Sequence, residues 1–122
     1  MNIVVVEDSP VMQRVLLNTL AELPGAKVVG AARGEAEAVA LIVRERPHLV
    51  LLDLFLSPGH GFKVLKDVRE AGLMCKVLVM TNELIHEGYR HRGAELGVLA
   101  FHDKGAGLGP LLADVERMIA GA

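Results

Sequence analysis

Three nearly continuous apolar runs restrict the fold of this chain more than any other feature of the sequence. They are residues 3–6 (IVVV), residues 49–54 (LVLLDL, interrupted only by Asp53) and residues 76–80 (KVLVM). Such runs are typical of parallel strands that helices cover on both faces, whereas strands with one face in water alternate apolar and polar residues. The sequence therefore predicts an α/β fold built on a parallel sheet.

Helical patterns separate the strand patterns along the whole chain. Ser9 and Pro10 are suited to begin a helix, because serine caps free N–H groups and proline has the φ angle of a first helical turn. The stretch 83–95 is the least clearly helical, since it is polar and contains two glycines. The predicted strands are 2–6, 27–32, 48–53, 76–80 and 98–101, and the predicted helices are 10–23, 35–46, 62–71, 83–95 and 108–120. Five βα units of this kind make a doubly wound sheet, in which ligands bind beyond the carboxyl ends of the strands.

The size of the chain allows one domain. With 122 residues, of which 52% are hydrophobic, the chain is long enough for one well-filled core and too short for two. No apolar run approaches the ~20 residues of a membrane-spanning helix. Met1 leads almost directly into the first predicted strand and leaves no room for a signal peptide. We therefore expect a cytoplasmic protein without membrane contact and without an output domain after the last helix.

The net charge and the few aromatic residues argue against a nucleic-acid binder. The formal net charge is −2, and the chain has one tyrosine, three phenylalanines and no tryptophan. A nucleic-acid binder would need a basic patch, and so few rings make a platform for stacked bases or sugars improbable. Cys75 is the only cysteine, so no internal disulfide is possible, and we expect a buried or half-buried thiol.

Polar residues lie at or just beyond the ends of four predicted strands. Glu7 and Asp8 follow the first strand, and Asp53 ends the third. Thr81 follows the fourth strand, and Lys104 comes shortly after the last. Because the carboxyl ends of parallel strands meet at one edge of the sheet, these side chains are predicted to share a pocket. Three carboxylates, a hydroxyl and an ammonium suit a divalent metal and a phosphoryl group.

Each of these residues also has a simpler interpretation. Glu7 and Asp8 fit a solvated loop in which Asp8 or the next serine caps the following helix. Lys104 alone fits a surface lysine, and Thr81 alone fits a strand end. Asp53 differs from the others, because burying an unpaired carboxylate within an apolar run would be costly. The functional interpretation therefore depends on all of these residues occurring together at the strand ends.

The histidines do not predict a zinc site. His86 and His91 are five residues apart, which is a poor spacing for shared ligation on a helix, and no cysteine is near them. His60 and His102 are expected to be exposed, in a loop and at a strand end. The charged stretch 83–95 fits either a solvated face or a partner-binding face.

In this arrangement the chain resembles a response-regulator receiver domain of bacterial two-component signalling, over essentially its whole length. The resemblance is carried by the run RPHLVLLDLFLSPGHGF, which is similar to the family's third strand and following loop, and by Glu7-Asp8, Asp53, Thr81-Asn82 and Lys104. It implies a flavodoxin-like (βα)5 fold with strand order 2-1-3-4-5. Residues 1–122 would then be one receiver domain, similar to single-domain chemotaxis regulators.

The resemblance implies a role for each residue of the set. Asp53 would be the nucleophile that takes up the phosphoryl group as an acyl phosphate. The cofactor would be Mg²⁺ (or Mn²⁺), with Asp8 and Asp53 as direct ligands. The backbone carbonyl of Phe55 would be the third protein ligand, and Glu7 would act through water. Lys104 would bind a phosphoryl oxygen, and would pair with Asp53 when metal and phosphate are absent.

The resemblance also implies a switch. Thr81 would donate its hydroxyl to another phosphoryl oxygen, and its movement would leave space into which Phe101 can turn. The altered surface would be that of the fourth helix, the fifth strand and the fifth helix. Phe55, Asn82 and Glu83 flank the pocket at positions that influence water access in this family, and a bulky Phe55 beside Asn82 predicts slow self-dephosphorylation.

The chain departs from the commonest family pattern at four positions. Pro58 comes one residue later than usual, and Gly105 stands where many members have a proline after the lysine. Asn82 replaces a smaller residue, and Phe101 replaces a tyrosine. None of these departures removes a reacting group. They therefore concern the conformational readout and the lifetime of the acyl phosphate more than the chemistry of phosphoryl transfer.

The sequence leaves several functions open. The first is a phospho-acceptor that is charged by a histidine kinase or a histidine phosphotransfer protein, signals to a downstream protein, and catalyses only its own phosphorylation and dephosphorylation. A phosphatase of the haloacid-dehalogenase type would need a second aspartate where Phe55 stands. A flavodoxin-like cofactor binder would need a Gly/Ser/Thr-rich turn where Glu7 and Asp8 stand. A receiver that works by binding alone is the remaining alternative.

Overall fold

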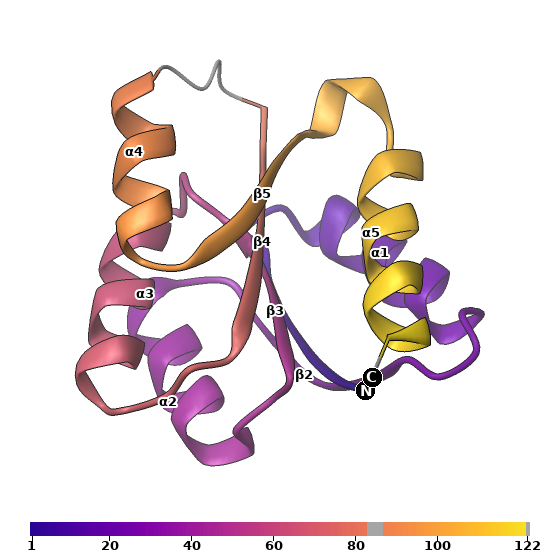
Figure 1. Ribbon diagram of the computed structural model, residues 1–122, viewed down its shortest axis with the longest axis horizontal. Coiled ribbons are helices and arrows are strands. Elements are labelled where there is room, and N and C mark those ends of the chain that lie inside the picture. Colours follow the sequence, from indigo (N-terminus) through magenta and orange to yellow (C-terminus); the bar gives the residue numbers. More distant parts are fainter. Residues whose placement is uncertain (83–86, 122) are drawn as a thin grey trace.

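Within the described residues, five parallel strands form one sheet in the order β2-β1-β3-β4-β5, which confirms the predicted fold (Figure 1). The structure is a computed structural model that describes residues 1–82 and 87–121. The strands are β1 (Asn2–Val6), β2 (Lys27–Ala32), β3 (Leu49–Asp53), β4 (Lys76–Thr81) and β5 (Val98–Asp103). The helices are α1 (Pro10–Ala21), α2 (Glu35–Glu45), α3 (Gly61–Glu70), α4 (Glu87–Glu95) and α5 (Gly109–Ala120), with a 3-10 turn η1 (Lys104–Ala106) before the last.

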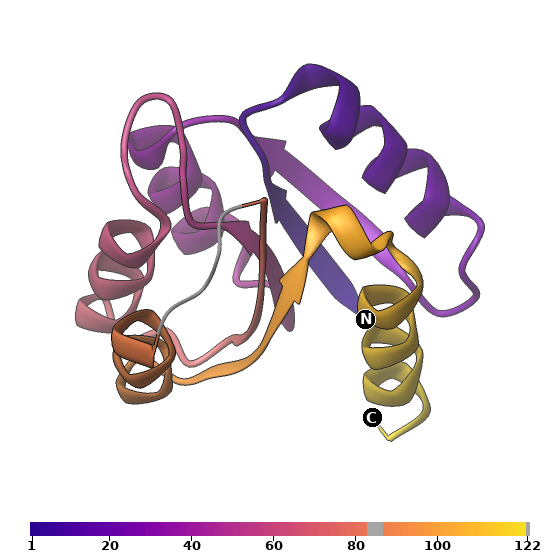
Figure 2. The ribbon, with the colours of Figure 1, turned by 90° about the horizontal axis from the view of Figure 1, so that it is seen from above.

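The helices lie in two layers, which explains why the central strands are apolar on both faces. Helices α1 and α5 cover one face of the sheet, and α2, α3 and α4 cover the other (Figures 1 and 2). In β1, Ile3 and Val5 pack into the core beneath α1 and α5. Val4 and Val6 pack into the core on the opposite side. All four side chains are completely buried, so an alternating pattern would place polar groups in one of the two cores.

The observed boundaries differ from the predicted ones at three places. Strand β5 continues for two residues past its predicted end, because His102 and Asp103 still pair with the end of β4. Helix α1 ends two residues early, at Ala21, because the next N–H groups turn back to carbonyls within its last turn. Helix α4 is described from Glu87, so the first four residues of the predicted 83–95 lie outside the described part. The other boundaries agree within one residue.

The register of the sheet brings the ends of four strands to the same edge. Glu7 follows directly after β1. Asp53, the last residue of β3, lies opposite Met80 of β4. Thr81, the last residue of β4, lies opposite Asp103 of β5. The polar residues at these strand ends therefore meet at one edge, as predicted.

One arginine joins the far ends of α3 and α4. Arg69 Nη1 donates hydrogen bonds to the carbonyl oxygens of Leu73, at 3.0 Å, and Cys75, at 2.9 Å. Its Nε donates to the carbonyl oxygen of Leu96, just beyond α4, at 3.0 Å. Cys75 is half-buried, as expected, and burial raises the pKa of its thiol. No helix among residues 1–82 and 87–121 is long and apolar enough to cross a membrane.

Candidate functional site

Three carboxylates gather at the carboxyl edge of the sheet. Glu7, Asp8 and Asp53 each offer one oxygen, and these oxygens lie within 4.8 Å of one another. They line a pocket of about 160 Å³, which corresponds to the liquid volume of about five water molecules. The residues that line the pocket are Glu7, Asp8, Ser9, Asp53, Phe55, Thr81, Asn82 and Lys104. The pocket therefore contains the full set that the sequence predicts to share one site.

Lys104 supplies the positive charge of the pocket. Its Nζ lies 2.8 Å from Asp53 Oδ2 and 2.5 Å from Glu7 Oε1. The side chains of Lys104 and Asp53 are each 5% exposed, and that of Glu7 is 0% exposed. The expected pairing of Lys104 with Asp53 is thus present, and Glu7 shares the same ammonium. Burial lowers the pKa of Lys104, but the hydrogen bonds and the charges of Asp53 and Glu7 together outweigh burial and raise that pKa, so the ammonium stays charged.

Glu7 is the most buried acid of the site. Burial raises its pKa to about 7, ahead of the opposing effect of Lys104 and of the Ser9 N–H. Its Oε2 accepts a hydrogen bond of 3.1 Å from that N–H. Its Oε1 lies against Lys104 Nζ and has no further polar partner among the described residues. A buried carboxylate oxygen with one such contact keeps a lone pair that can accept from a metal-bound water.

Asp53 is held by the backbone that follows it. Phe55 N donates a hydrogen bond of 3.2 Å to Asp53 Oδ1. Gly61 N donates one of 2.6 Å to the carbonyl oxygen of Leu54. A Cβ at position 61 would lie 2.5 Å from the carbonyl oxygen of Asp53. Gly61 is therefore needed for the loop to fold back against the end of β3, a requirement that the sequence analysis missed.

Two long side chains that the sequence analysis also missed fix the end of β1. Gln13 Nε2 donates to the carbonyl oxygens of Glu7 and Ala32, both at 3.3 Å. Arg33 Nε donates to the carbonyl oxygen of Asp8 at 3.2 Å. These contacts satisfy carbonyl oxygens at the turn between β1 and α1 and hold the two acids in place. Neither residue carries a sequence signal, because both act on the backbone of distant residues.

The start of α1 lies beside the acids, as predicted. Ser9 Oγ accepts a hydrogen bond of 3.3 Å from Met12 N, and Pro10 occupies the first position of the helix. The capping residue is therefore Ser9, which leaves the carboxylate of Asp8 available to the pocket.

The predicted switch residues lie on neighbouring strands. Thr81 is buried and lines the pocket, beside the exposed Asn82. Phe101 is half-buried, and its ring lies beneath the guanidinium of Arg90, 5.5 Å from the ring centroid. A Cβ at position 93 would lie 2.4 Å from Phe101 Cζ, so the ring rests against the backbone of α4. Glu83, predicted to tune the lifetime, lies outside the described residues.

The prediction that His60 and His102 are exposed is wrong. His60 Nδ1 accepts a hydrogen bond of 3.1 Å from Phe62 N and caps α3. His102 Nε2 lies 2.7 Å from Asp114 Oδ2, and its side chain is 14% exposed. The first histidine is half-buried because the rings of Phe55, Phe62 and Tyr89 lie against it. The second is covered because β5 continues to it and it meets Asp114 of α5. His91 is exposed, and its spacing to His86 cannot be tested because His86 lies outside the described residues.

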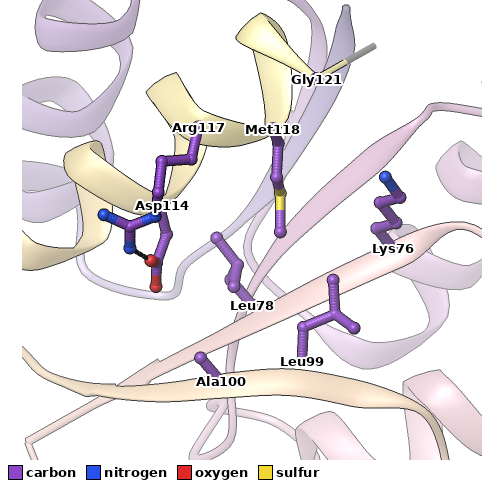
Figure 3. Close-up of a pocket in the computed structure, with 8 residues that line it drawn as sticks. All are labelled: Lys76, Leu78, Leu99, Ala100, Asp114, Arg117, Met118 and Gly121. Carbon is purple, nitrogen blue, oxygen red and sulfur yellow. Dashed lines mark ion pairs between the residues drawn. The ribbon is translucent and has the colours of Figure 1, made fainter.

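A second pocket lies between α5 and the strands β4 and β5, and contains none of the predicted site residues (Figure 3). Its lining combines apolar and charged side chains, and Asp114 forms an ion pair with Arg117. The residues that line it are Lys76, Leu78, Leu99, Ala100, Asp114, Arg117, Met118 and Gly121. It lacks the clustered carboxylates that a divalent metal needs.

The acidic pocket has the donor set of a hard divalent cation. Mg²⁺ and Mn²⁺ prefer oxygen ligands, and Mg²⁺ keeps several waters when one or two carboxylates bind it. Asp8 and Asp53 provide carboxylate oxygens within 4.8 Å of an oxygen of Glu7. The residues present therefore fit such an ion.

Comparisons with known proteins point to one family. The family model of the response regulator receiver domain matches residues 3–116. A putative transcriptional regulator of Pseudomonas aeruginosa is 29% identical over 119 residues, which are 98% of this chain and 56% of that protein. The probable C4-dicarboxylate response regulator DctR of Bacillus subtilis is 30% identical over 79 residues, which are 65% of this chain and 35% of that protein. The chain thus spans about half or less of the length of these relatives.

Solved structures show the same fold. The BeF3-activated receiver domain of Klebsiella pneumoniae RstA superposes with a TM-score of 0.83 at 26% identity, covering 98% of both chains. The response regulator domain of Thermotoga maritima CheB superposes with a TM-score of 0.85 at 23% identity, covering 100% of this chain and 97% of that chain.

Proposed function

This chain belongs to the response regulator receiver family, and on that premise we propose that it is a phospho-acceptor whose nucleophile is Asp53. The phosphoryl group would come from a histidine kinase or a histidine phosphotransfer protein. Residues 1–122 would act as one receiver domain that signals by binding a downstream protein. The domain would catalyse only its own phosphorylation and dephosphorylation.

The observation that carries this proposal is the position of Lys104 between Asp53 and Glu7. A carboxylate that attacks phosphorus must approach a group that is itself negative, so phosphoryl transfer depends on charge neutralisation and positioning. Lys104 Nζ, 2.8 Å from Asp53 Oδ2, is placed to follow the charge as it moves onto the phosphoryl oxygens. An Asp53 oxygen would form the new bond to phosphorus as the phosphorus–nitrogen bond of the donor histidine breaks.

A divalent metal fits the same pocket. Asp8, Asp53 and the backbone carbonyl of Phe55 would hold Mg²⁺ or Mn²⁺, and Glu7 would hold a metal-bound water through its free oxygen. When bound, the ion would neutralise charge on the phosphoryl oxygens. Lys104 would then leave Glu7, because the ion takes over the neutralisation of the acids.

The proposed switch connects the pocket to α4, β5 and α5. The hydroxyl of Thr81 would donate to a phosphoryl oxygen, and Phe101 would turn toward the space that Thr81 leaves. Support comes from their placement, since Thr81 lines the pocket and the ring of Phe101 rests against the backbone of α4. A movement of this ring would alter the face that a partner protein contacts.

Slow self-dephosphorylation is part of the proposal. Phe55 and Asn82 line the pocket, and together with Glu83 they would limit the access of water to the acyl phosphate. Decay of the acyl phosphate should be faster in Phe55→Ala than in the wild type. An unchanged or slower decay in this variant would contradict the lifetime assignment.

Direct phosphorylation tests the function. The protein is treated with acetyl phosphate or with beryllium fluoride, with and without Mg²⁺, beside the variant Asp53→Asn. Labelling that is labile in acid as well as in base is expected with acetyl phosphate and Mg²⁺, as an acyl phosphate requires. Labelling should be lost both in the chelated sample and in the variant, and an intact protein that never acquires the label would refute the proposal.

Residues of the pocket argue against the two alternative functions. Phe55 stands where a phosphatase of the haloacid-dehalogenase type would need its acid and base. The turn after β1 presents Glu7 and Asp8, whose charge would repel the phosphate of a flavin cofactor.

A further inference from the structure

Four rings form a cluster between the acidic pocket and α4. Phe55 contacts His60 edge-on, with ring centroids 5.3 Å apart, and Tyr89 edge-on at 5.8 Å. His60 stacks on Tyr89 at 6.1 Å. Phe62 contacts His60 at 5.3 Å and Tyr89 at 5.9 Å. The single tyrosine of the chain therefore lies against three rings from the segment that follows β3.

Tyr89 is one of the few residues that attach α4 to the rest of the domain. Seven of the nine residues of α4 are exposed. The exceptions are Tyr89, which is half-buried, and Gly93, which is buried. They are four residues apart and so face the same way. Since Gly93 has no side chain, Tyr89 is the one half-buried side chain among residues 87–95 as the structure describes them.

The other side of the cluster is continuous with the pocket. Phe55 lines the pocket, and its N–H donates to Asp53 Oδ1. Its backbone also forms an antiparallel bridge with His60. His60 N in turn donates a hydrogen bond of 3.0 Å to Glu35 Oε2 at the start of α2. The backbone at position 55 is therefore held from within the loop, and its ring is held from α4.

We propose that Tyr89 is a positioning residue for the acidic pocket, because its ring holds Phe55 and so fixes the backbone that faces the metal. Through the same contact with Phe55, a cation that binds in the pocket changes the surroundings of Tyr89. This connection reaches α4 through the loop after β3 and does not pass through Thr81 and Phe101. It deepens the proposed function, but it depends only on metal binding and not on phosphoryl transfer.

The composition of the chain provides a direct readout. The chain has one tyrosine and no tryptophan, so tyrosine fluorescence reports on position 89 alone. Titration of the metal-free protein with Mg²⁺ should change this emission. The change should persist in Thr81→Ala, which lacks the other connection, and should be lost in Asp8→Asn, which lacks a metal ligand. An emission that does not respond to Mg²⁺, or a response that is lost in Thr81→Ala, would overturn the proposal.

Substitution of Tyr89 tests whether its ring supports Mg²⁺ binding, separately from its use as a fluorescent probe. In Tyr89→Leu, calorimetric titration should show Mg²⁺ binding weakened by about threefold to tenfold, as expected for the loss of one or two aromatic contacts. Tyr89→Phe keeps the ring and should bind within about twofold of the wild type. His91→Ala, on an exposed part of α4, is the matched control and should also bind normally.

The outcomes separate the two proposals. If acetyl phosphate never labels Asp53 while Tyr89→Leu weakens Mg²⁺ binding, the proposed function fails and the positioning role stands. If Asp53 is labelled and Tyr89→Leu binds Mg²⁺ as the wild type does, the positioning role is wrong. If Tyr89→Leu does not fold, the fluorescence titration of the wild type and Thr81→Ala decides the question without it.

Discussion

Replacing Lys104 by methionine should destabilise the domain strongly, and the loss should depend on pH and Mg²⁺. The substitution keeps most of the side-chain volume and removes the charge that two buried carboxylates share. Removing one partner from a buried ion pair typically costs about 3–5 kcal/mol. The pocket is open to water on one side, so the lower end, about 3 kcal/mol, is expected at pH 8 without metal.

The pH dependence follows from Glu7. Its pKa in the folded protein is raised to about 7, above the ordinary value of 4.5, chiefly by burial. A carboxyl group with a raised folded pKa favours folding when protonated, so its contribution to stability falls as the pH rises from about 4.5 to about 7. Without Lys104 this pKa moves higher still. The difference between the variant and the wild type should therefore grow by about 1.4 kcal/mol for each pH unit above 7.

Urea unfolding followed by far-ultraviolet circular dichroism measures both effects. The wild type and Lys104→Met are compared in EDTA at pH 6, 7 and 8, and again with Mg²⁺. Since a ligand that binds the folded state at 100 times its dissociation constant stabilises by about 2.7 kcal/mol, Mg²⁺ should recover most of the loss in the variant.

The matched control is Lys66→Met. Lys66 is 50% exposed and lies 3.7 Å from Glu70, so its removal should cost less than about 0.5 kcal/mol at any of these pH values. A loss in Lys104→Met below about 1 kcal/mol at pH 8 in EDTA, or a loss equal at pH 6 and pH 8, would refute this account of the buried charges.

Three further predictions follow from packing and titration. Gly61→Ala should destabilise the domain by more than about 1 kcal/mol in urea unfolding, because the new methyl group would meet the carbonyl oxygen of Asp53. Gly93→Ala should destabilise the wild type, whose Phe101 ring occupies the space, but should stabilise Phe101→Ala by up to about 1 kcal/mol through helix propensity. The pKa of His102 is lowered, first by burial and second by Arg117. The free energy of unfolding should therefore fall as the pH drops below about 6.5. In His102→Gln, thermal unfolding should show a smaller change of stability with pH.

Controls for these predictions are available in the chain. Gly109→Ala adds a methyl group where nothing lies within 4 Å and should be neutral or stabilising. An equal effect of alanine at 61 and 109 would show that the close approach at Gly61 is not a constraint. A destabilising Gly93→Ala in the Phe101→Ala background, or an unchanged pH slope in His102→Gln, would show that the assigned contact is not the cause.

The sequence predicts the strands and the pocket because both follow from local rules. A run such as residues 3–6 has few alternatives to a strand covered on both faces. The acids and Lys104 then meet because parallel strands end at the same edge. Neither step requires knowledge of which side chains touch.

The residues that the sequence alone did not identify act on residues outside their own helix or strand. Gly61 is needed because of the carbonyl of Asp53, eight positions earlier, and Arg33 reaches the backbone of Asp8. His60 and His102 were predicted to be exposed because loop and strand-end positions usually are. Their partners, Tyr89 and Asp114, come from other elements, and a single sequence carries no pattern that pairs them.

The guanidinium of Arg69 determines how α4 can move. Three carbonyl oxygens, those of Leu73, Cys75 and Leu96, converge on it, so the last turn of α4 is tied to α3 and to the start of β4. Near the other end of α4, among residues 87–95, the half-buried side chain is that of Tyr89. A helix that is fixed at one end and held by few contacts at the other rotates about its fixed end instead of sliding along the sheet. The largest displacement would then fall at Glu87, the end nearest the acidic pocket, and the smallest at Glu95.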